Sequence, residues 1–202
     1  MILFFFFEPY ASKGARTVPK GYNFILIERL YRERTLFLCK EIKGTIVGQI
    51  IALLLYLSSE NDTNIFLYIN SPGGWVLSAM GIYDTMKSVL PDVCTLAMGL
   101  AASAASLILV GGTITKRVAF PHARVMIHQP STAFFQGTTK RLVLEGEEMF
   151  QIRNEIAEIY AQNTGKPISV IQKDLERDTY MSATEAQAYG IVDRIAKLKE
   201  QN

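Results

Sequence analysis

The sequence predicts an α/β fold in which strands and helices alternate around a partly parallel sheet. Two near-continuous apolar segments, 65–69 and 93–98, have the character of strands that are buried on both faces. A Pro-Gly-Gly break separates the first from a helix at about 76–89, and a turn at Gly99 separates the second from a helix that begins near Ala101. Two successive strand–helix units favour parallel pairing with right-handed crossovers.

Length and composition set the domain organisation. With 202 residues, 49% of them hydrophobic, the chain can bury the core of one domain. We expect a mobile N-terminal arm over 1–24, a single domain over 25–197 and a C-terminal tail over 198–202. The net charge of +2 comes from scattered basic residues, which disfavours nucleic-acid binding. The two cysteines are too few and too far apart for a metal site or a disulfide framework.

The N-terminus does not have the features of a targeting sequence. Its apolar stretch 1–7 ends at Glu8 and Pro9, which makes it too short to span a membrane. It also lacks the basic region and cleavage site of a secretory signal, and the Arg- and Ser-rich character of a transit peptide. We therefore expect the protein to work in the compartment where it is made. The stretch 1–7 gives the arm an aromatic tip suited to docking on a partner.

The first predicted elements of the domain are a short strand at 36–38 and an apolar helix at 47–57. After the two strand–helix units, short strands are expected at 117–120 and 124–129, with a hinge at Pro121 between them. The uncharged stretch 93–115 is long enough for a membrane span, but its glycines favour a buried strand and helix instead.

The last third of the chain carries a polar, aromatic segment at 131–138, which suits either a loop or an exposed edge strand. A long helix is predicted from about Thr139 to Asn163, and Gly165 and Pro167 stop it. Its apolar residues recur at helical spacing, at Leu142, Met149, Ile152, Ile156 and Ile159. Such a helix either packs against its own domain or projects as an arm for self-assembly, and the sequence leaves both open.

Ser103 and His128 suggest a serine hydrolase. A hydroxyl is a poor nucleophile until a base removes its proton, and histidine is the usual base. The chain has only two histidines, and small residues around Ser103 let a substrate backbone come close. Gly73 and Gly74 end the neighbouring predicted strand, so one of their N–H groups can face a developing oxyanion at the same sheet edge. The alternatives are a buried helix serine and an ordinary tight turn.

An acid is needed to orient the histidine ring. Asp174, Asp178 and Asp193 are the candidates in the C-terminal quarter, and spacing alone does not choose among them. A capping box over 182–185 gives Glu185 a structural role at the start of a short helix.

Several long motifs, found in the right order between about 25 and 195, closely resemble the ClpP family, the proteolytic subunits of ATP-dependent caseinolytic proteases. They are YINSPGG at 68–74, IYDTM at 82–86, MGLAAS at 98–103, RVMIHQP at 124–130, ERD at 176–178 and MSA at 181–183. Trp75 and the segments 114–117, 121–124 and 183–190 look most like plastid-encoded members. That likeness implies residence in the plastid stroma.

The resemblance implies a role for each candidate residue. Ser103 becomes the nucleophile, His128 the general base and then acid, and Asp178 the orienting carboxylate. The backbone N–H groups of Gly74 and Ala104 become the oxyanion hole. The implied reaction is hydrolysis of peptide bonds in unfolded proteins by a serine endopeptidase that needs no metal or other cofactor, because ATP is used by the partner unfoldase.

The implied architecture is a ClpP/crotonase-like fold of repeated ββα units with a protruding helix–strand handle at about 129–159. The handle interlocks two heptameric rings, formed by copies of the chain or by Clp paralogues, and 1–24 lies in the axial region. A hexameric AAA+ unfoldase is the implied partner, with no nucleic acid or membrane. Two other functions stay open: a weakly active or non-catalytic ring subunit, and a crotonase-like acyl-CoA enzyme. Retention of the Ser, His and Asp argues against the first, and the Ser/His pair argues against the second, a class that usually works through Glu or Asp.

Overall fold

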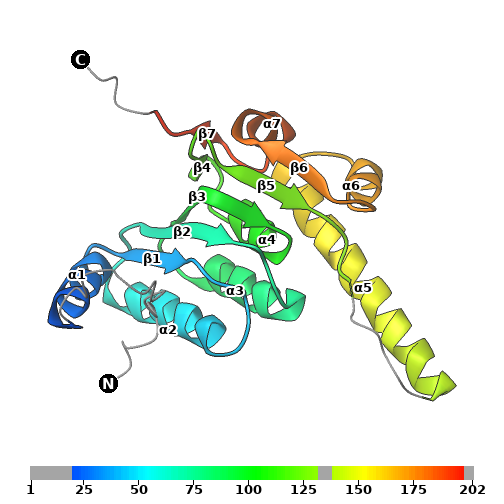
Figure 1. Ribbon diagram of the computed structural model, residues 1–202, viewed down its shortest axis with the longest axis horizontal. Helices are drawn as coiled ribbons and strands as arrows, with labels where there is room; N and C mark the ends of the chain where they lie inside the picture. Colours follow the sequence, from blue (N-terminus) through cyan, green and yellow to red (C-terminus); the bar gives the residue numbers. More distant parts are fainter. Residues whose placement is uncertain (1–19, 132–137, 198–202) are drawn as a thin grey trace, which may run out of the picture.

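The computed structural model describes residues 20–131 and 138–197. Its helices are α1 (Lys20–Arg32), α2 (Thr45–Glu60), α3 (Val76–Ser88), α4 (Ala104–Val110), α5 (Thr139–Thr164), α6 (Ile168–Asp174) and α7 (Ala183–Tyr189). Its strands are β1 (Thr35–Leu38), β2 (Ile65–Ser71), β3 (Val93–Ala102), β4 (Arg117–Ala119), β5 (Arg124–Ile127), β6 (Thr179–Ser182) and β7 (Arg194–Ile195) (Figure 1). The predicted strands and helices of the domain are therefore present, and the segment expected as a loop or edge strand falls mostly outside the described residues.

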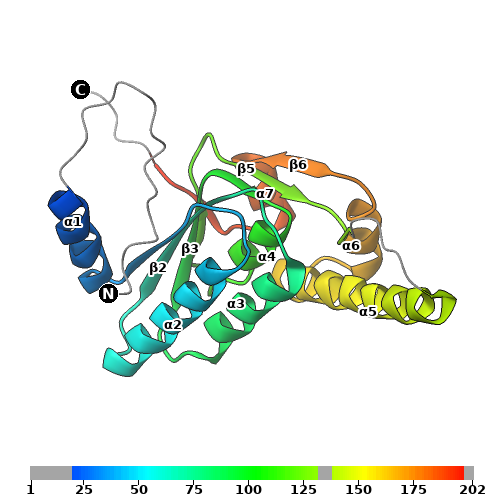
Figure 2. The ribbon, with the colours of Figure 1, turned by 60° about the horizontal axis from the view of Figure 1, so that its bottom comes forward.

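The strands of the described residues form one sheet, in which β1, β2, β3, β4 and β7 are parallel neighbours in that order. Helices α2, α3 and α4 follow one another across one face of this sheet (Figure 2). The apolar side chains of β2 at Ile65, Leu67 and Ile69 are completely buried. The α/β fold with a largely parallel sheet is confirmed.

Strand β3 is the centre of the sheet because it pairs with three other strands. Its residues 95–97 pair with β4, whereas residues 100–102 pair with β5. Strand β5 in turn pairs antiparallel with β6. The C-terminal end of β3 therefore lies beside the C-terminal end of β5 and the N-terminal end of β6, and three segments far apart in sequence meet there.

The prediction of a turn at Gly99 is wrong. Strand β3 continues through Gly99 to Ala102, and the next helix begins at Ala104. Gly99 has φ 78°, and a side-chain Cβ there would lie 2.7 Å from Oδ1 of Asn70. This oxygen accepts a hydrogen bond from the N–H of Leu100 at 3.0 Å. Glycine is therefore needed for a close side-chain approach inside the strand, and the turn to the helix comes at Ser103.

The first described helix overlaps the segment expected as an N-terminal arm. Helix α1 begins at Lys20, inside the segment expected as an arm, while residues 1–19 lie outside the described part of the chain. Two exposed ion pairs with i,i+4 spacing accompany the helix, Arg29–Glu33 and Arg32–Glu28. Such pairs add a few tenths of a kcal/mol each, on the order of 0.3–0.5. Ion pairs this weak are not sufficient to predict helix α1 from the sequence.

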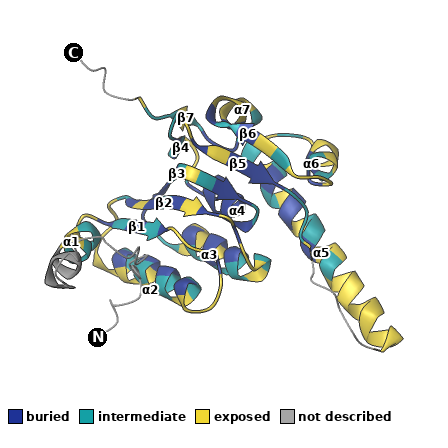
Figure 3. Ribbon diagram, viewed as in Figure 1, coloured by how far each residue is buried: buried dark blue, intermediate teal, exposed yellow. Residues whose placement is uncertain are grey.

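Helix α5 combines both expected behaviours of a long helix. Its C-terminal half packs on the core, where Ile152, Ile156 and Tyr160 are buried. Its N-terminal part, 139–148, is exposed at every residue and extends away from the sheet (Figures 1 and 3). The structure therefore has a projecting helical arm attached to the domain by a packed base.

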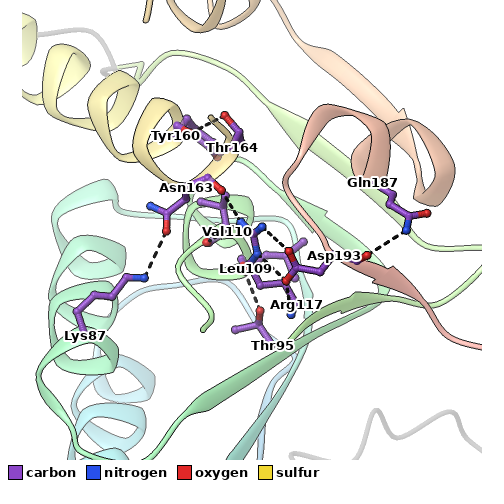
Figure 4. A network of polar contacts seen from close by, with 10 residues as sticks. All are labelled: Lys87, Thr95, Leu109, Val110, Arg117, Tyr160, Asn163, Thr164, Gln187 and Asp193. Atoms are coloured by element: carbon purple, nitrogen blue, oxygen red, sulfur yellow. Dashed lines mark hydrogen bonds and ion pairs between the residues drawn. The ribbon is translucent and has the colours of Figure 1, made fainter. Parts of the chain in front are cut away.

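A buried ion pair connects the packed half of α5 with the segment just before β7 (Figure 4). Arg117, which is 4% exposed, holds both carboxylate oxygens of Asp193 with Nε and Nη2 at 3.0 and 2.6 Å. Its Nη1 donates to the carbonyl of Asn163 near the end of α5 at 2.9 Å. Burial alone would raise the pKa of Asp193, but the hydrogen bonds and charge of Arg117 outweigh it and lower that pKa. The resulting stability is present at neutral pH and is lost as the pH falls through the lowered pKa.

No helix among the described residues is long and apolar enough to cross a membrane. The stretch 93–115, for which a membrane span was an alternative, forms β3 and α4 instead.

Candidate active site

Ser103 occupies the sharp turn between β3 and α4. Its backbone has φ 56° and ψ −127°, a conformation that few residues other than glycine adopt. The N–H of Ser103 donates to the carbonyl of Met126 on β5 at 2.8 Å, which fixes the turn against that strand. A strained strand-to-helix turn of this kind exposes the side chain at the end of the sheet. The alternative of a helix serine whose hydroxyl bonds its own backbone does not hold.

His128 follows β5 directly and meets Ser103 across the sheet edge. Its Nε2 atom lies 2.7 Å from Oγ of Ser103, within hydrogen-bond distance. The pairing of Ala102 with Met126 accounts for this contact, because it brings the ends of β3 and β5 together. The geometry suits transfer of the serine proton to the imidazole.

Of the three candidate acids, Asp178 alone lies at the imidazole. Its Oδ1 is 3.3 Å from Nδ1 of His128, on the side of the ring away from Ser103. The antiparallel pairing of Ile127 with Thr179 explains this position, since the next residues along the two strands are His128 and Asp178. Asp174 instead accepts a hydrogen bond from the hydroxyl of Tyr189 at 2.8 Å, and Asp193 is held by Arg117.

The predicted capping box is present. The Ser182 hydroxyl accepts from the N–H of Glu185, and the Glu185 carboxylate accepts from the N–H of Ser182 at 2.8 Å. Hydrogen bonds from Ser182 lower the pKa of Glu185. This glutamate therefore has the structural role expected for it, at the start of α7.

Gly73 and Gly74 let the end of β2 approach the turn that carries Ser103. A Cβ on Gly73, which has φ 96°, would lie 2.8 Å from Cβ of Ser103. A Cβ on Gly74, with φ 150°, would collide with the backbone of Ile42. Among the described residues, no acceptor takes a hydrogen bond from the N–H of Gly74 or of Ala104. Both residues line the cavity beside Ser103, so both N–H groups are available to a bound group.

This cavity has a volume of about 210 Å³ and opens next to Ser103 and His128. Part of its wall is apolar and comes from Val76, Leu107, Met149 and Ile156. The last two belong to the packed half of α5, so the long helix contributes directly to the site. A cavity of this size and character accepts an apolar side chain.

One polar pair beside this cavity was not predicted from the sequence. The hydroxyl of Tyr160, on α5, lies 2.6 Å from Oγ of Ser106, in the first turn of α4. Burial is the larger influence on Tyr160 and raises its pKa, against the opposing effect of its hydrogen bond with Ser106. The phenol therefore remains protonated at neutral pH. No short-range pattern identifies two residues that are 54 positions apart.

No group of three or more His, Cys, Asp or Glu side chains that suits a metal ion occurs in 20–131 or 138–197.

Comparison with known proteins identifies relatives over most of the chain. A family model described as Clp protease matches residues 20–199. The "Chloroplastic ATP-dependent Clp protease proteolytic subunit 1" of Arabidopsis thaliana is 60% identical over 172 residues, which are 85% of this chain and 88% of that protein. The "ATP-dependent Clp protease proteolytic subunit" of Arabis hirsuta is 60% identical, and that of Aethionema cordifolium 59%, over the same shares.

Proposed function

The chain belongs to the Clp protease family, and from this membership we propose that it is a serine endopeptidase subunit that cleaves unfolded proteins with Ser103 as its nucleophile. The observation that carries this proposal is the alignment of Ser103 Oγ, His128 Nε2 and Nδ1, and Asp178 Oδ1 at 2.7 and 3.3 Å. Hydroxyl, imidazole and carboxylate in this order are the arrangement that activates a serine.

The proposed reaction follows from these contacts. His128 takes the proton of Ser103 as Oγ attacks the carbonyl carbon of the scissile bond, and Asp178 stabilises the imidazolium that forms. The N–H groups of Gly74 and Ala104 donate to the oxyanion. His128 then gives the proton to the leaving amine, and water releases the acyl group by the same steps. No step requires a metal or another cofactor, and we assign the use of ATP to the partner unfoldase.

The substrate proposed for this site is an extended polypeptide. An extended chain laid beside Gly74 can use backbone hydrogen bonds, as in strand addition to a sheet. The apolar cavity of about 210 Å³ next to Ser103 would then receive an apolar side chain of the substrate. We propose that the strand of the handle, expected within about 129–159, lies along the other side of the substrate; residues 132–137 of this segment lie outside the described part of the chain.

We further propose that the subunit assembles into two stacked heptameric rings with copies of itself or with paralogues. The projecting part of α5 supports this assignment because it exposes Leu142, Val143 and Leu144, with exposures of 44%, 54% and 55%, and Phe150 just after it is 61% exposed. Several exposed apolar side chains on one helical segment are expected to be covered in the working complex. A AAA+ unfoldase would deliver the substrate. The names of the relatives suggest a plastid location, for which we propose the stroma.

Two other functions are less well supported. A non-catalytic ring subunit would not need Ser103, His128 and Asp178 in contact, nor the strained backbone at Ser103. An acyl-CoA enzyme of the crotonase type works through carboxylate acid–base groups, whereas the cavity here is lined by a serine and a histidine.

Reaction with a fluorophosphonate probe tests the proposed function directly. The probe should attach to one serine per chain, and peptide mapping should locate the adduct on Ser103, because only an activated hydroxyl reacts. Ser106, three residues away and bonded to the carbonyl of Ser103 at 2.6 Å, serves as an internal control and should stay unmodified. Heat-denatured protein should not react. Absence of an adduct on Ser103 in the folded protein would refute the proposal.

A charge placed on the projecting helix tests the assembly. Leu144→Glu should shift the protein to smaller species in native mass spectrometry and should lower peptidase activity, because burying an unpaired carboxylate in an interface is costly. Leu55→Glu is the matched control, since Leu55 has a similar exposure of 52% and belongs to α2, a helix that lies apart from the projecting end of α5 (Figure 2). If both variants keep the wild-type assembly, Leu144 is not in the interface.

A further inference from the structure

The pair formed by Ser106 and Tyr160 is connected to the nucleophile through one carbonyl group. Oγ of Ser106 donates to the carbonyl oxygen of Ser103 at 2.6 Å, and the N–H of Ser106 donates to the same oxygen at 2.9 Å. Since the Ser106 hydroxyl has one proton and uses it there, the contact of 2.6 Å with Tyr160 requires the phenol to be the donor. The hydrogen-bond chain therefore runs from Tyr160, which donates to Ser106, to Ser106, which donates to the Ser103 carbonyl.

The carbonyl of Ser103 and the N–H of Ala104 are parts of one planar peptide group. In a trans peptide they point in opposite directions, so a carbonyl held on one side fixes the direction of the N–H on the other. The Ala104 N–H has no acceptor among the described residues, and Ala104 lines the cavity beside Ser103. Hydrogen bonds to the carbonyl also polarise the amide and strengthen its N–H as a donor.

We propose that Tyr160 and Ser106 are positioning residues of the oxyanion hole: through the Ser103 carbonyl they hold the Ser103–Ala104 peptide with its N–H directed at the reacting group. The inference rests on the proposed function, since it takes Ala104 as an oxyanion donor. Neither side chain touches the substrate carbonyl in this role.

The setting of the pair supports a role beyond packing. The Ser103 peptide has a backbone conformation that is unfavourable for serine, so an external restraint is needed to keep it. Tyr160 is 2% exposed and Ser106 is completely buried, so water does not compete for these hydrogen bonds. Tyr160 comes from the packed base of α5, an element outside the nucleophile turn. The long helix therefore supplies one rigid end of the restraint.

Steady-state kinetics of the assembled protein test this role with Tyr160→Phe and Ser106→Ala. A positioning defect of the oxyanion hole should lower kcat on a short fluorogenic peptide about tenfold, less than the roughly 10²–10³-fold cost of removing a direct donor. KM should stay unchanged. The affinity for a peptide boronate, whose tetrahedral oxygen occupies the oxyanion hole, should fall in parallel with kcat, whereas the affinity for a cleaved product peptide should not change.

The double variant supplies a further criterion. If both residues act through one hydrogen-bond chain, Tyr160→Phe should add little to the loss caused by Ser106→Ala. Tyr83→Phe is the matched control, because Tyr83 is a buried tyrosine whose hydroxyl accepts from Asn163 at 3.2 Å, away from the Ser103 turn. It should keep wild-type kcat and boronate affinity.

Three outcomes would overturn this inference without touching the proposed function. The first is unchanged kcat in both Tyr160→Phe and Ser106→Ala, and the second is a rise in KM alone, which would make Tyr160 only a cavity wall. The third is an equal loss in Tyr83→Phe, which would indicate general loosening. A wild-type protein without hydrolysis that depends on Ser103 would refute the proposed function and this inference together, whereas an active wild type matched by both variants would refute this inference alone.

Discussion

Ser103→Ala should abolish peptide hydrolysis, and His128→Ala should do so to nearly the same extent. In the proposed mechanism the two side chains act as one unit, with Nε2 of His128 at 2.7 Å from Oγ of Ser103, so the loss of either removes the activated nucleophile. In triad proteases such losses are on the order of 10⁶-fold in kcat, and the double variant is no worse than either single one. We expect the same non-additivity here.

His122→Ala is the control for this prediction. His122 is the other histidine of the chain and is exposed on the turn before β5, away from Ser103. Its removal should leave kcat unchanged. Native mass spectrometry should find all these variants assembled as the wild type, because neither Ser103 nor His128 belongs to the apolar core. Substantial hydrolysis by His128→Ala would mean that another group serves as the base.

The parts of the fold that were predictable are those fixed by local pattern. Continuous apolar runs gave β2 and β3, and helical spacing gave α5 to within one residue at its end. Gly99 was misleading because a glycine in an apolar run has two uses, a turn or a close approach, and only the position of Asn70 decides between them. Whether α5 packs or projects depends on how far the core extends along the helix. Its C-terminal half packs on the core, and its N-terminal part projects.

The candidate site was predictable to the point where strand register begins to matter. Ser103 and His128 each follow an apolar strand, and ends of parallel strands meet at one sheet edge. The choice of acid needs the antiparallel pairing of β5 with β6, which no spacing along the chain reveals. The hydrogen bond between Tyr160 and Ser106 is still harder to predict from the sequence, because it depends on how α5 packs against α4.

Asp178→Asn should lower kcat strongly while leaving the stability of the protein unchanged. An amide at this position can hold the imidazole in the wrong tautomer, and it no longer stabilises the imidazolium. In triads with a buried acid this substitution costs on the order of 10⁴-fold. Asp178 is 62% exposed, so water screens part of its charge, and we expect a smaller loss, on the order of 10³-fold.

The two other aspartates provide matched controls for Asp178→Asn. Asp174→Asn keeps a carbonyl oxygen for the hydroxyl of Tyr189 and should retain wild-type kcat. Asp193→Asn removes the charge that faces the buried Arg117, so it should lower the thermal midpoint of unfolding while folded protein keeps its kcat. Measured together, the three variants separate orientation of the imidazole from stability of the fold. A severe loss of kcat in Asp174→Asn with normal activity in Asp178→Asn would assign the orienting role to Asp174, against the 3.3 Å contact between Asp178 and His128.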